Sequence, residues 1–197
     1  MDNVLILGRG KYGKSSLAES LCAEYVAQGL TPIVLDPIGI EHKWEGARVT
    51  KEPKEFLAWF WAARDTPAFV EEYALVTKRV PGKDWLEPEF VLTATTGRNQ
   101  IGPEARGNWT HYSCHRLTQL DVTLRDQCSE LYLFACRDDD AYQLSLDYGR
   151  PVLRQAPALN KLEYLFVSPD TKEVTLWEVD PESLETRRIQ RKLRPEA

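Results

Sequence analysis

The chain has 197 residues, of which 43% are hydrophobic and 28% are charged, and its formal net charge is -5. This length suits one domain with an ordinary buried core. The negative net charge excludes a uniformly basic protein that binds nucleic acid or membranes through overall charge.

The expected lack of targeting signals and the pattern of cysteines favour a cytoplasmic protein. We expect no membrane span because no apolar run is long enough to cross a bilayer. We also expect no signal peptide, because Asp2 precedes a short apolar run. The four cysteines lack C-x-x-C spacing, and three lie in apolar runs, which disfavours zinc and disulfides and favours a reducing compartment.

A phosphate-binding motif lies near the start of the chain. Residues 8–15 fit the pattern G-x-x-x-x-G-K-[ST], with an apolar run at 4–7 before them and a helical pattern at 16–21 after them. This strand–loop–helix context is the one the motif requires. The predicted nucleotide-site residues here are Gly8, Arg9, Gly10, Lys11, Tyr12, Gly13, Lys14, Ser15 and Ser16.

The residue types of the motif explain its chemistry. Glycines let the backbone aim N–H groups at phosphate oxygens, and the helix that begins near Lys14 adds the positive end of its dipole. Lys14 can reach the β- and γ-phosphates, and Ser15 can ligate Mg²⁺, so ATP and Mg²⁺ are the predicted cofactors. Tyr12 can stack on a base or cover the loop, and the pattern favours the cover.

Acidic residues follow two predicted strands. Residues 31–35 form a buried strand that ends at Asp36, which can either face a ligand at the sheet edge or cap a turn. Residues 67–70 form a short strand that ends at Glu71 and Glu72. In a phosphate-loop enzyme, Glu71 would hold Mg²⁺ and Glu72 would activate water, and the alternative is an acid-rich helix start.

The middle of the chain supplies a predicted β-rich run over residues 109–116 that ends in His115 and Arg116. His115 is therefore either a sensor of the γ-phosphate or a structural histidine at a strand end. A basic loop over residues 78–84 is either solvated or in contact with DNA phosphates. A predicted helix over 85–97 ends directly before Arg98.

The remaining predicted elements follow the same strand and helix alternation. Residues 47–50 and 130–137 are expected as strands, and residues 53–64, 121–127 and 138–147 as helices. The aromatic residues of 53–64 are assigned to the core or to a subunit contact in preference to base stacking. Three aspartates at the start of 138–147 suit the helix dipole better than a metal site.

The C-terminal part changes character. Residues 162–167 and 173–179 flank a turn and predict a β-hairpin. We assign residues 1–180 to one phosphate-loop ATPase domain that includes this hairpin at about 162–179. Residues 181–197 are assigned to a polar and basic tail, which is either a DNA-facing or partner-binding arm or simply solvated.

Several segments taken in order resemble the FtsK/HerA superfamily of DNA-pumping ATPases, within which small viral genome-packaging ATPases are closest in length. The segments are residues 8–15, 35–39, 71–72, 96–99, 115–116 and 124–137. The resemblance covers roughly residues 3–148. Glu71 stands where this family has aspartate, and His115 stands where it has glutamine.

The resemblance implies a RecA-like P-loop NTPase, an α/β fold whose mostly parallel central sheet is flanked by helices. It also implies a homo-oligomeric ring, a hexamer, with ATP between subunits and an arginine from the neighbour at each site. Arg98, Arg116 and Arg137 are the candidates for this arginine. Double-stranded DNA would pass through the pore and be held by its backbone.

The implied function is an Mg-ATP-dependent motor that pumps DNA, as in viral or phage genome packaging. Capsid or portal vertex proteins would then be partners, and the protein would act in the host cytoplasm or on the virion. Two alternatives stay open: a small-molecule kinase of the P-loop class and a nucleotide-dependent assembly switch. The length and the first strand–loop–helix fit the kinase, and the atypical Glu71 fits the switch.

Overall fold

The computed structural model describes residues 3–39, 44–77, 86–97, 107–171 and 173–190. Within these ranges, nine strands form one sheet in the order β3-β2-β4-β5-β1-β6-β7-β8-β9. The strands are β1 (Asn3–Leu7), β2 (Ile33–Leu35), β3 (Arg48–Thr50), β4 (Pro67–Val70), β5 (Trp109–Cys114), β6 (Cys128–Phe134), β7 (Glu163–Val167), β8 (Val174–Val179) and β9 (Thr186–Arg188). The helices are α1 (Lys14–Ala27), α2 (Pro53–Ala62), α3 (Tyr73–Thr77), α4 (Glu87–Thr96), α5 (Val122–Asp126) and α6 (Asp138–Asp147), with 3₁₀ helices η2 (Leu117–Gln119) and η3 (Pro151–Ala158).

The sheet is parallel from β3 to β6 and antiparallel from β6 to β9. This confirms the expected mostly parallel α/β sheet with antiparallel C-terminal strands. Parallel strands place their carboxyl ends at one edge, where ligands bind in open α/β sheets. The segments that follow β1, β2, β4 and β5 therefore meet at that edge.

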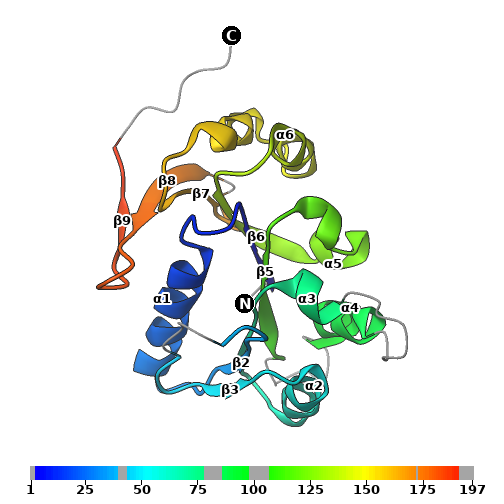
Figure 1. Cartoon of the computed structure of the whole chain (residues 1–197). Helices are drawn as coiled ribbons and strands as arrows, with labels where there is room; N and C mark the ends of the chain where they lie inside the picture. Colours follow the sequence, from blue (N-terminus) through cyan, green and yellow to red (C-terminus); the bar gives the residue numbers. More distant parts are fainter. Residues whose placement is uncertain (1–2, 40–43, 78–85, 98–106, 172, 191–197) are drawn as a thin grey trace.

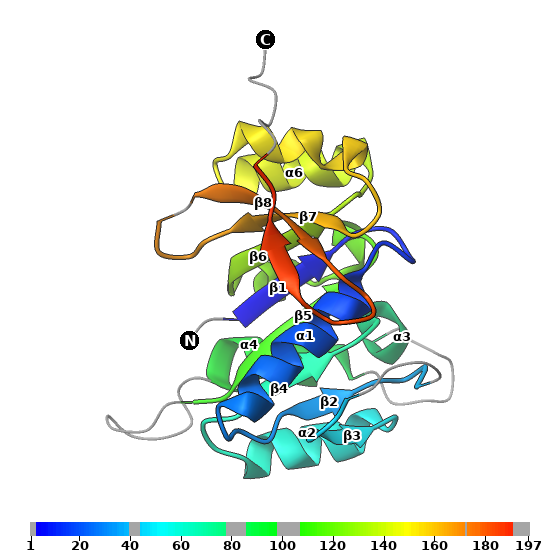
Figure 2. The ribbon, with the colours of Figure 1, turned by 90° about the vertical axis from the view of Figure 1, so that its left-hand side faces the viewer.

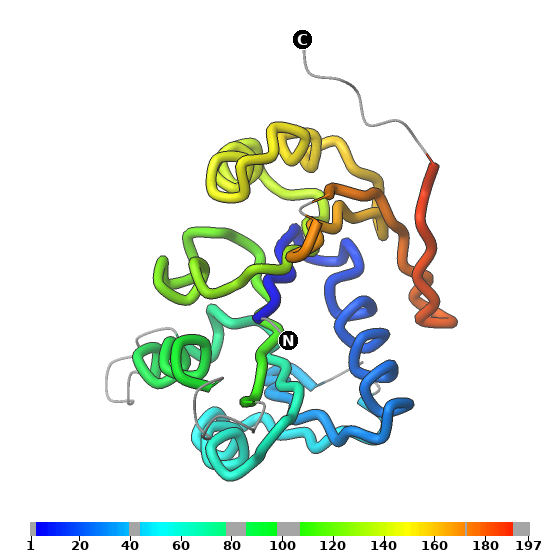
Figure 3. Tube along the Cα trace, turned by 180° about the vertical axis from the view of Figure 1, so that it is seen from behind, coloured from blue at the N-terminus to red at the C-terminus, as the bar shows by residue number. Residues whose placement is uncertain are grey.

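Helices cover both faces of the sheet. The blue α1 lies on one side of the strands in Figure 1, and α2, α4, α5 and α6 lie on the other. Figure 3 shows the same separation of α1 from α2 and α4 from behind. Strand β1 explains the two layers: Val4 and Ile6 pack with α1, whereas Leu5 and Leu7 pack into the core beneath the other helices. A strand buried on both faces reads as a continuous apolar run, as residues 4–7 do.

The C-terminal strands extend the sheet further than the sequence analysis expected. The hairpin is present as β7 and β8, and β9 adds a third antiparallel strand within the stretch assigned to a polar tail. Arg187 of β9 donates two hydrogen bonds to the Glu178 carboxylate, at 2.9 and 2.6 Å. Figure 2 shows the turn between β8 and β9 passing in front of the first turn of α1. Helices α3 and η3 were not predicted from the sequence either.

All four cysteines are buried free thiols, and burial raises the pKa of Cys22 and Cys136 to about 12. Across the described ranges, no helix is both long and apolar enough to span a membrane.

A buried histidine ties β5 to β4 and α1. The Nδ1 atom of His111 lies 3.2 Å from the carbonyl oxygen of Ala68, which can only accept, so Nδ1 carries the proton. Its Nε2 atom then accepts from the Tyr25 hydroxyl at 3.3 Å, and that hydroxyl accepts from the indole N–H of Trp109 at 3.3 Å. With a neutral imidazole, every donor and acceptor in this series of hydrogen bonds has a suitable partner. Burial lowers the pKa of His111 to about 4.

We predict that this histidine makes the fold sensitive to acid. Because the folded-state pKa lies below the unfolded value of about 6.5, the unfolded chain binds more protons between these values. The contribution of His111 to the free energy of unfolding is complete above pH 6.5 and is lost as the pH falls toward 4. We expect about 2 kcal/mol less free energy of unfolding at pH 5 than at pH 7.5 from this residue, measured by urea denaturation.

His111→Phe is the control, because a phenyl ring keeps the stack on Phe69, whose ring centroid lies 4.3 Å away, and cannot titrate. Its stability should change less between the two pH values than that of the wild type. Equal losses in both proteins would contradict the prediction.

Candidate functional site

The phosphate loop lies between β1 and α1, in the context the motif requires. Its start is held against β6: the Arg9 N–H donates to the Ala135 carbonyl oxygen at 2.8 Å, and a Cβ on Gly8 would lie 2.5 Å from Phe134 Cβ. Gly13 has a φ of +107°, which favours glycine at the point where α1 begins. Both glycines are therefore required by close packing or by backbone conformation.

Lys14 is buried at the centre of the site, with 5% of its surface exposed. Its ammonium donates to the Arg9 carbonyl oxygen at 3.3 Å and to Nδ1 of His115 at 3.1 Å. Burial lowers the pKa of Lys14, and the nearby Glu72 and Glu71 oppose that effect. The ammonium is thus positioned and only partly compensated, as a phosphate-binding lysine needs to be.

His115 connects Lys14 to Glu72. Because the ammonium can only donate, Nδ1 of His115 accepts, and Nε2–H donates to Glu72 Oε2 at 2.8 Å. The side-chain oxygen of Gln119 accepts from the backbone N–H of His115 at 3.1 Å and fixes the end of β5. Glu72 has a φ of +49°, an uncommon conformation that aims its carboxylate at the site.

Ser15 and Glu71 form a second pair beside the first. The Ser15 hydroxyl donates to Glu71 Oε2 at 2.9 Å, and Glu71 is 2% exposed. The two carboxylates predicted from the end of β4 therefore point to different partners: Glu71 to the start of α1, and Glu72 to the end of β5. Both lie next to the phosphate loop.

Ser113 belongs to this edge and was missed by the sequence analysis. Val70 of β4 pairs with Tyr112 of β5, so Glu71 and Ser113 are the next residues of neighbouring strands and face the α1 side. Ser113 is 1% exposed, and its hydroxyl has no hydrogen-bond partner among the described residues. Ser113 lies two residues before His115, and residues two apart on a strand face the same side, so this spacing could have identified Ser113 from the sequence.

Asp36 and Tyr12 have structural roles in this state. Asp36 Oδ1 accepts from the backbone N–H groups of Ile38 and Gly39, at 3.2 and 2.8 Å, and Oδ2 accepts from the Trp44 indole at 3.1 Å. Asp36 thus caps the turn after β2, the second of its two expected roles. Tyr12 is partly buried and packs against both core clusters.

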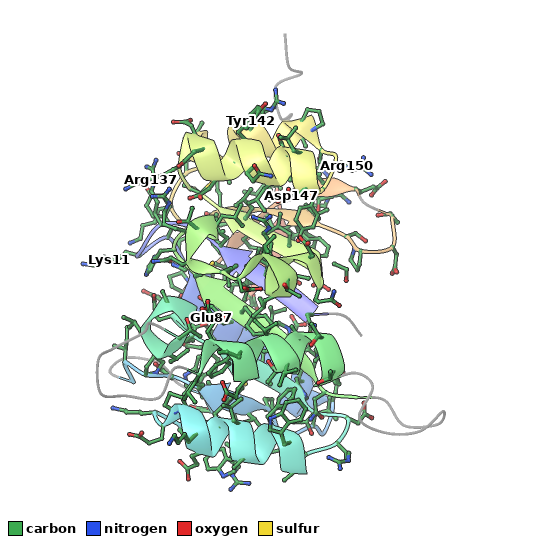
Figure 4. All side chains as sticks on the ribbon, turned by 90° about the vertical axis from the view of Figure 1, so that its right-hand side faces the viewer. Lys11, Glu87, Arg137, Tyr142, Asp147 and Arg150 are labelled. Carbon is green, nitrogen blue, oxygen red and sulfur yellow. The ribbon has the colours of Figure 1, made fainter. Side chains whose placement is uncertain are left out.

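The three candidate arginines differ in what the structure says of them. Arg98 lies outside the described residues, as does the basic loop over 78–84. Arg116 donates to Asp140 at 2.7 Å and to Asp139 at 2.9 Å, which binds it to α6. Arg137 lines a hollow of about 460 Å³ with Arg9, Gly10, His115 and Arg116. Figure 4 shows Arg137 and Lys11 projecting on the same side of the molecule.

The donors at this edge fit Mg²⁺. The Ser15 hydroxyl, the Glu71 carboxylate and the unpartnered Ser113 hydroxyl are hard oxygen donors, which Mg²⁺ prefers. In the part of the chain described here, no three His, Cys, Asp or Glu residues form a metal cage. That is compatible with Mg²⁺, which is usually held by one or two carboxylates together with substrate phosphates.

The fold and the phosphate loop define the class: this is an α/β domain with the fold of P-loop ATPases. No family model matches the sequence, and no curated protein matches it. Solved structures do match. The DNA-packaging ATPase B204 of Sulfolobus turreted icosahedral virus has a TM-score of 0.69 and 15% identity over 89% of this chain and 96% of its own.

Two further structures show the same likeness. The genome-packaging NTPase B204 of Sulfolobus turreted icosahedral virus 2, in complex with AMPPCP, has a TM-score of 0.67 and 16% identity over 89% of this chain and 96% of its own. The pCW3 conjugation coupling protein TcpA, with ATPγS, has a TM-score of 0.67 and 13% identity over 90% of this chain and 59% of its own. The chain thus matches structures of viral genome-packaging NTPases and of a conjugation coupling protein at low identity, and the packaging NTPases are the kind of protein that the sequence resemblance led us to expect.

We predict that Ser113→Ala raises the free energy of unfolding of the ligand-free protein by about 1 kcal/mol. The variant removes a buried hydroxyl that has no partner among the described residues, whose burial costs free energy. Urea denaturation measures the change. Ser145→Ala is the matched control, because that buried hydroxyl donates to the Tyr142 carbonyl and accepts from Arg154.

The Ser145→Ala variant should have a free energy of unfolding about 1 kcal/mol lower than that of the wild type. If Ser113→Ala is destabilised to the same extent, the Ser113 hydroxyl has a hydrogen-bond partner in the folded protein and the assignment is wrong.

Proposed function

We propose that this protein is an Mg-ATP-dependent motor that translocates double-stranded DNA, in the manner of viral or phage genome packaging. The observation that carries the proposal is the chain of contacts from Lys14 through His115 to Glu72, beside the Ser15–Glu71 pair. A phosphate-binding cation, a linking histidine and a carboxylate together form the apparatus for attack of water on a terminal phosphate. The fold shared with packaging NTPases supports the choice of a DNA track.

Each residue has a role in this proposal. Lys14 neutralises charge on the β- and γ-phosphates, and Ser15 and Glu71 hold Mg²⁺. When bound, Mg²⁺ supplies positive charge that stabilises the phosphate oxygens. Glu72 accepts a proton from the attacking water, and His115 holds Glu72 until Lys14 turns from Nδ1 to a phosphate. His115 thereby acts as the γ-phosphate sensor.

An arginine would stabilise charge on the transferring phosphoryl group. Among the described candidates we favour Arg137, because Arg116 is already engaged by Asp139 and Asp140. Arg98 remains a candidate on sequence grounds. In the proposed ring, a hexamer, this arginine comes from a neighbouring subunit, and capsid or portal vertex proteins are further partners.

We expect purified protein to hydrolyse ATP. We also expect the rate of hydrolysis to rise when double-stranded DNA is added. Lys14→Ala should abolish both activities, because the buried ammonium is the central positive charge of the site. Phosphate release with and without DNA measures this, and a mass measurement in ATP reports whether the ring has formed.

The other outcomes distinguish the alternatives. If the protein forms rings but its rate of ATP hydrolysis is the same with and without DNA, the motor function is contradicted. Stimulation of that rate by a nucleoside would then favour a small-molecule kinase. Tight ATP binding without turnover by assembled protein would favour the assembly switch.

We predict that Glu72→Gln reduces the hydrolysis rate at least about a hundredfold and leaves ATP binding close to that of the wild type. The amide keeps the size of the side chain but cannot accept the proton from water. Glu71→Gln is the comparison: it weakens the contact with Ser15 and should reduce Mg²⁺-dependent ATP affinity. The kinetic constants kcat and KM separate the two, and an unchanged kcat in Glu72→Gln would refute the assignment of the base.

A further inference from the structure

The turn between β8 and β9 encloses a hollow next to the phosphate loop. Its volume is about 380 Å³, and it is lined by Leu162, residues 178–182 and residues 185–187. In Figures 1 and 2 this turn lies beside the first turns of α1. The hollow is built from the end of the hairpin and from β9, segments to which the sequence analysis assigned no part in a nucleotide site.

The hollow adjoins Gly13. A Cβ on Gly13 would lie 3.0 Å from Leu162 Cδ2 and 3.2 Å from Val179 Cγ1, and both of these residues line the hollow. The Leu162 N–H donates to the Tyr12 carbonyl oxygen at 3.1 Å. Leu162 and Val179 therefore lie between the hollow and the point where the phosphate loop ends and α1 starts.

The two ends of the phosphate loop have different neighbours: His115 lies beside Gly10, whereas Leu162 and Val179 lie beside Gly13. A Cβ on Gly10 would lie 3.2 Å from His115 Cε1, and His115 contacts Glu72, so the reacting end of a triphosphate belongs on the Gly10 side. The Gly13 side then faces the other end of the phosphate chain. In a nucleoside triphosphate, that end carries the ribose and the base.

The walls of the hollow suit a nucleoside. Leu162 and Pro181 present apolar surface of the kind that packs against a base. Arg187 pairs with Glu178, so this part of the wall carries little net charge. This part of the wall is therefore suited to a flat, partly apolar group.

Two carboxylates add polarity and direction. Glu182 and Glu185 are exposed, and both line the hollow. Asp180 is used locally, since it accepts from the backbone N–H groups of Glu182 and Ser183. Carboxylates accept hydrogen bonds from ribose hydroxyls and base amino groups, and they repel phosphates. The charge thus favours the nucleoside end in the hollow and the phosphate end on Lys14.

We propose that this hollow binds the nucleoside half of the triphosphate, with the base against Leu162 and Pro181 and its donor groups on Glu182 and Glu185. The proposal rests on the proposed nucleotide binding by the phosphate loop and adds a second, C-terminal part to that site. The C-terminal strands are then part of the nucleotide site as well as of the sheet.

The test compares the non-hydrolysable analogue AMPPCP with inorganic tripolyphosphate by calorimetry in Mg²⁺, using the full chain. We expect the Glu182→Gln, Glu185→Gln double variant to bind AMPPCP about tenfold more weakly, because two charge-assisted hydrogen bonds are weakened. Its affinity for tripolyphosphate should not fall, because the variant removes negative charge. The control is Asp170→Asn, Glu173→Gln, which makes the same charge change at exposed residues of the β7–β8 turn and should bind AMPPCP like the wild type.

Two results would overturn the proposal: unchanged AMPPCP affinity in the Glu182, Glu185 variant, or an equal loss for AMPPCP and tripolyphosphate. Failure of the underlying function looks different. If the wild type binds neither ligand, or if Lys14→Ala binds AMPPCP normally, the phosphate-loop site itself is refuted.

Discussion

The arrangement of the site depends on one buried charge, the ammonium of Lys14. A cation that is 5% exposed has to be compensated by dipoles and opposite charge. The Arg9 carbonyl lies within the phosphate loop, His115 follows β5, and Glu71 and Glu72 follow β4. The strand order β4-β5-β1 brings these three segments to one edge, so the sheet topology and the electrostatics of the lysine depend on each other.

Close packing holds the phosphate loop in place at both ends. Phe134 of β6 leaves no room for a side chain at Gly8, His115 after β5 lies close to Gly10, and Leu162 and Val179 pack against Gly13. A loop held from both sides can present its N–H groups to an anion without being reorganised first. The antiparallel strands therefore do more than close the sheet: β7 and β8 also support the start of α1.

Much of the parallel part of the fold could be predicted because its signals are local. Residues 4–7 are apolar, the motif from Gly8 to Ser15 has fixed spacing, and helix α1 follows directly. Strands β2 and β4 lie where short apolar runs end in polar residues, and β5 lies in the predicted β-rich run over 109–116. The strand predicted over 130–137 instead runs from Cys128 to Phe134, because pairing with β1 and β7 determines its ends. Strand β9 was missed because its three polar residues are recognisable only beside β8.

The sequence by itself determined the phosphate loop, the alternation of strands and helices, and the acidic and histidine residues at strand ends. The tertiary structure decided which of these side chains meet: Glu71 with Ser15, Glu72 with His115, and Asp36 with its own turn. It also decided that Ser113 belongs to the site and that Arg116 is bound to α6. The physical reason is that motif and periodicity are local properties of the chain. Hydrogen-bond partners and burial, by contrast, depend on strand order and register between residues far apart in sequence.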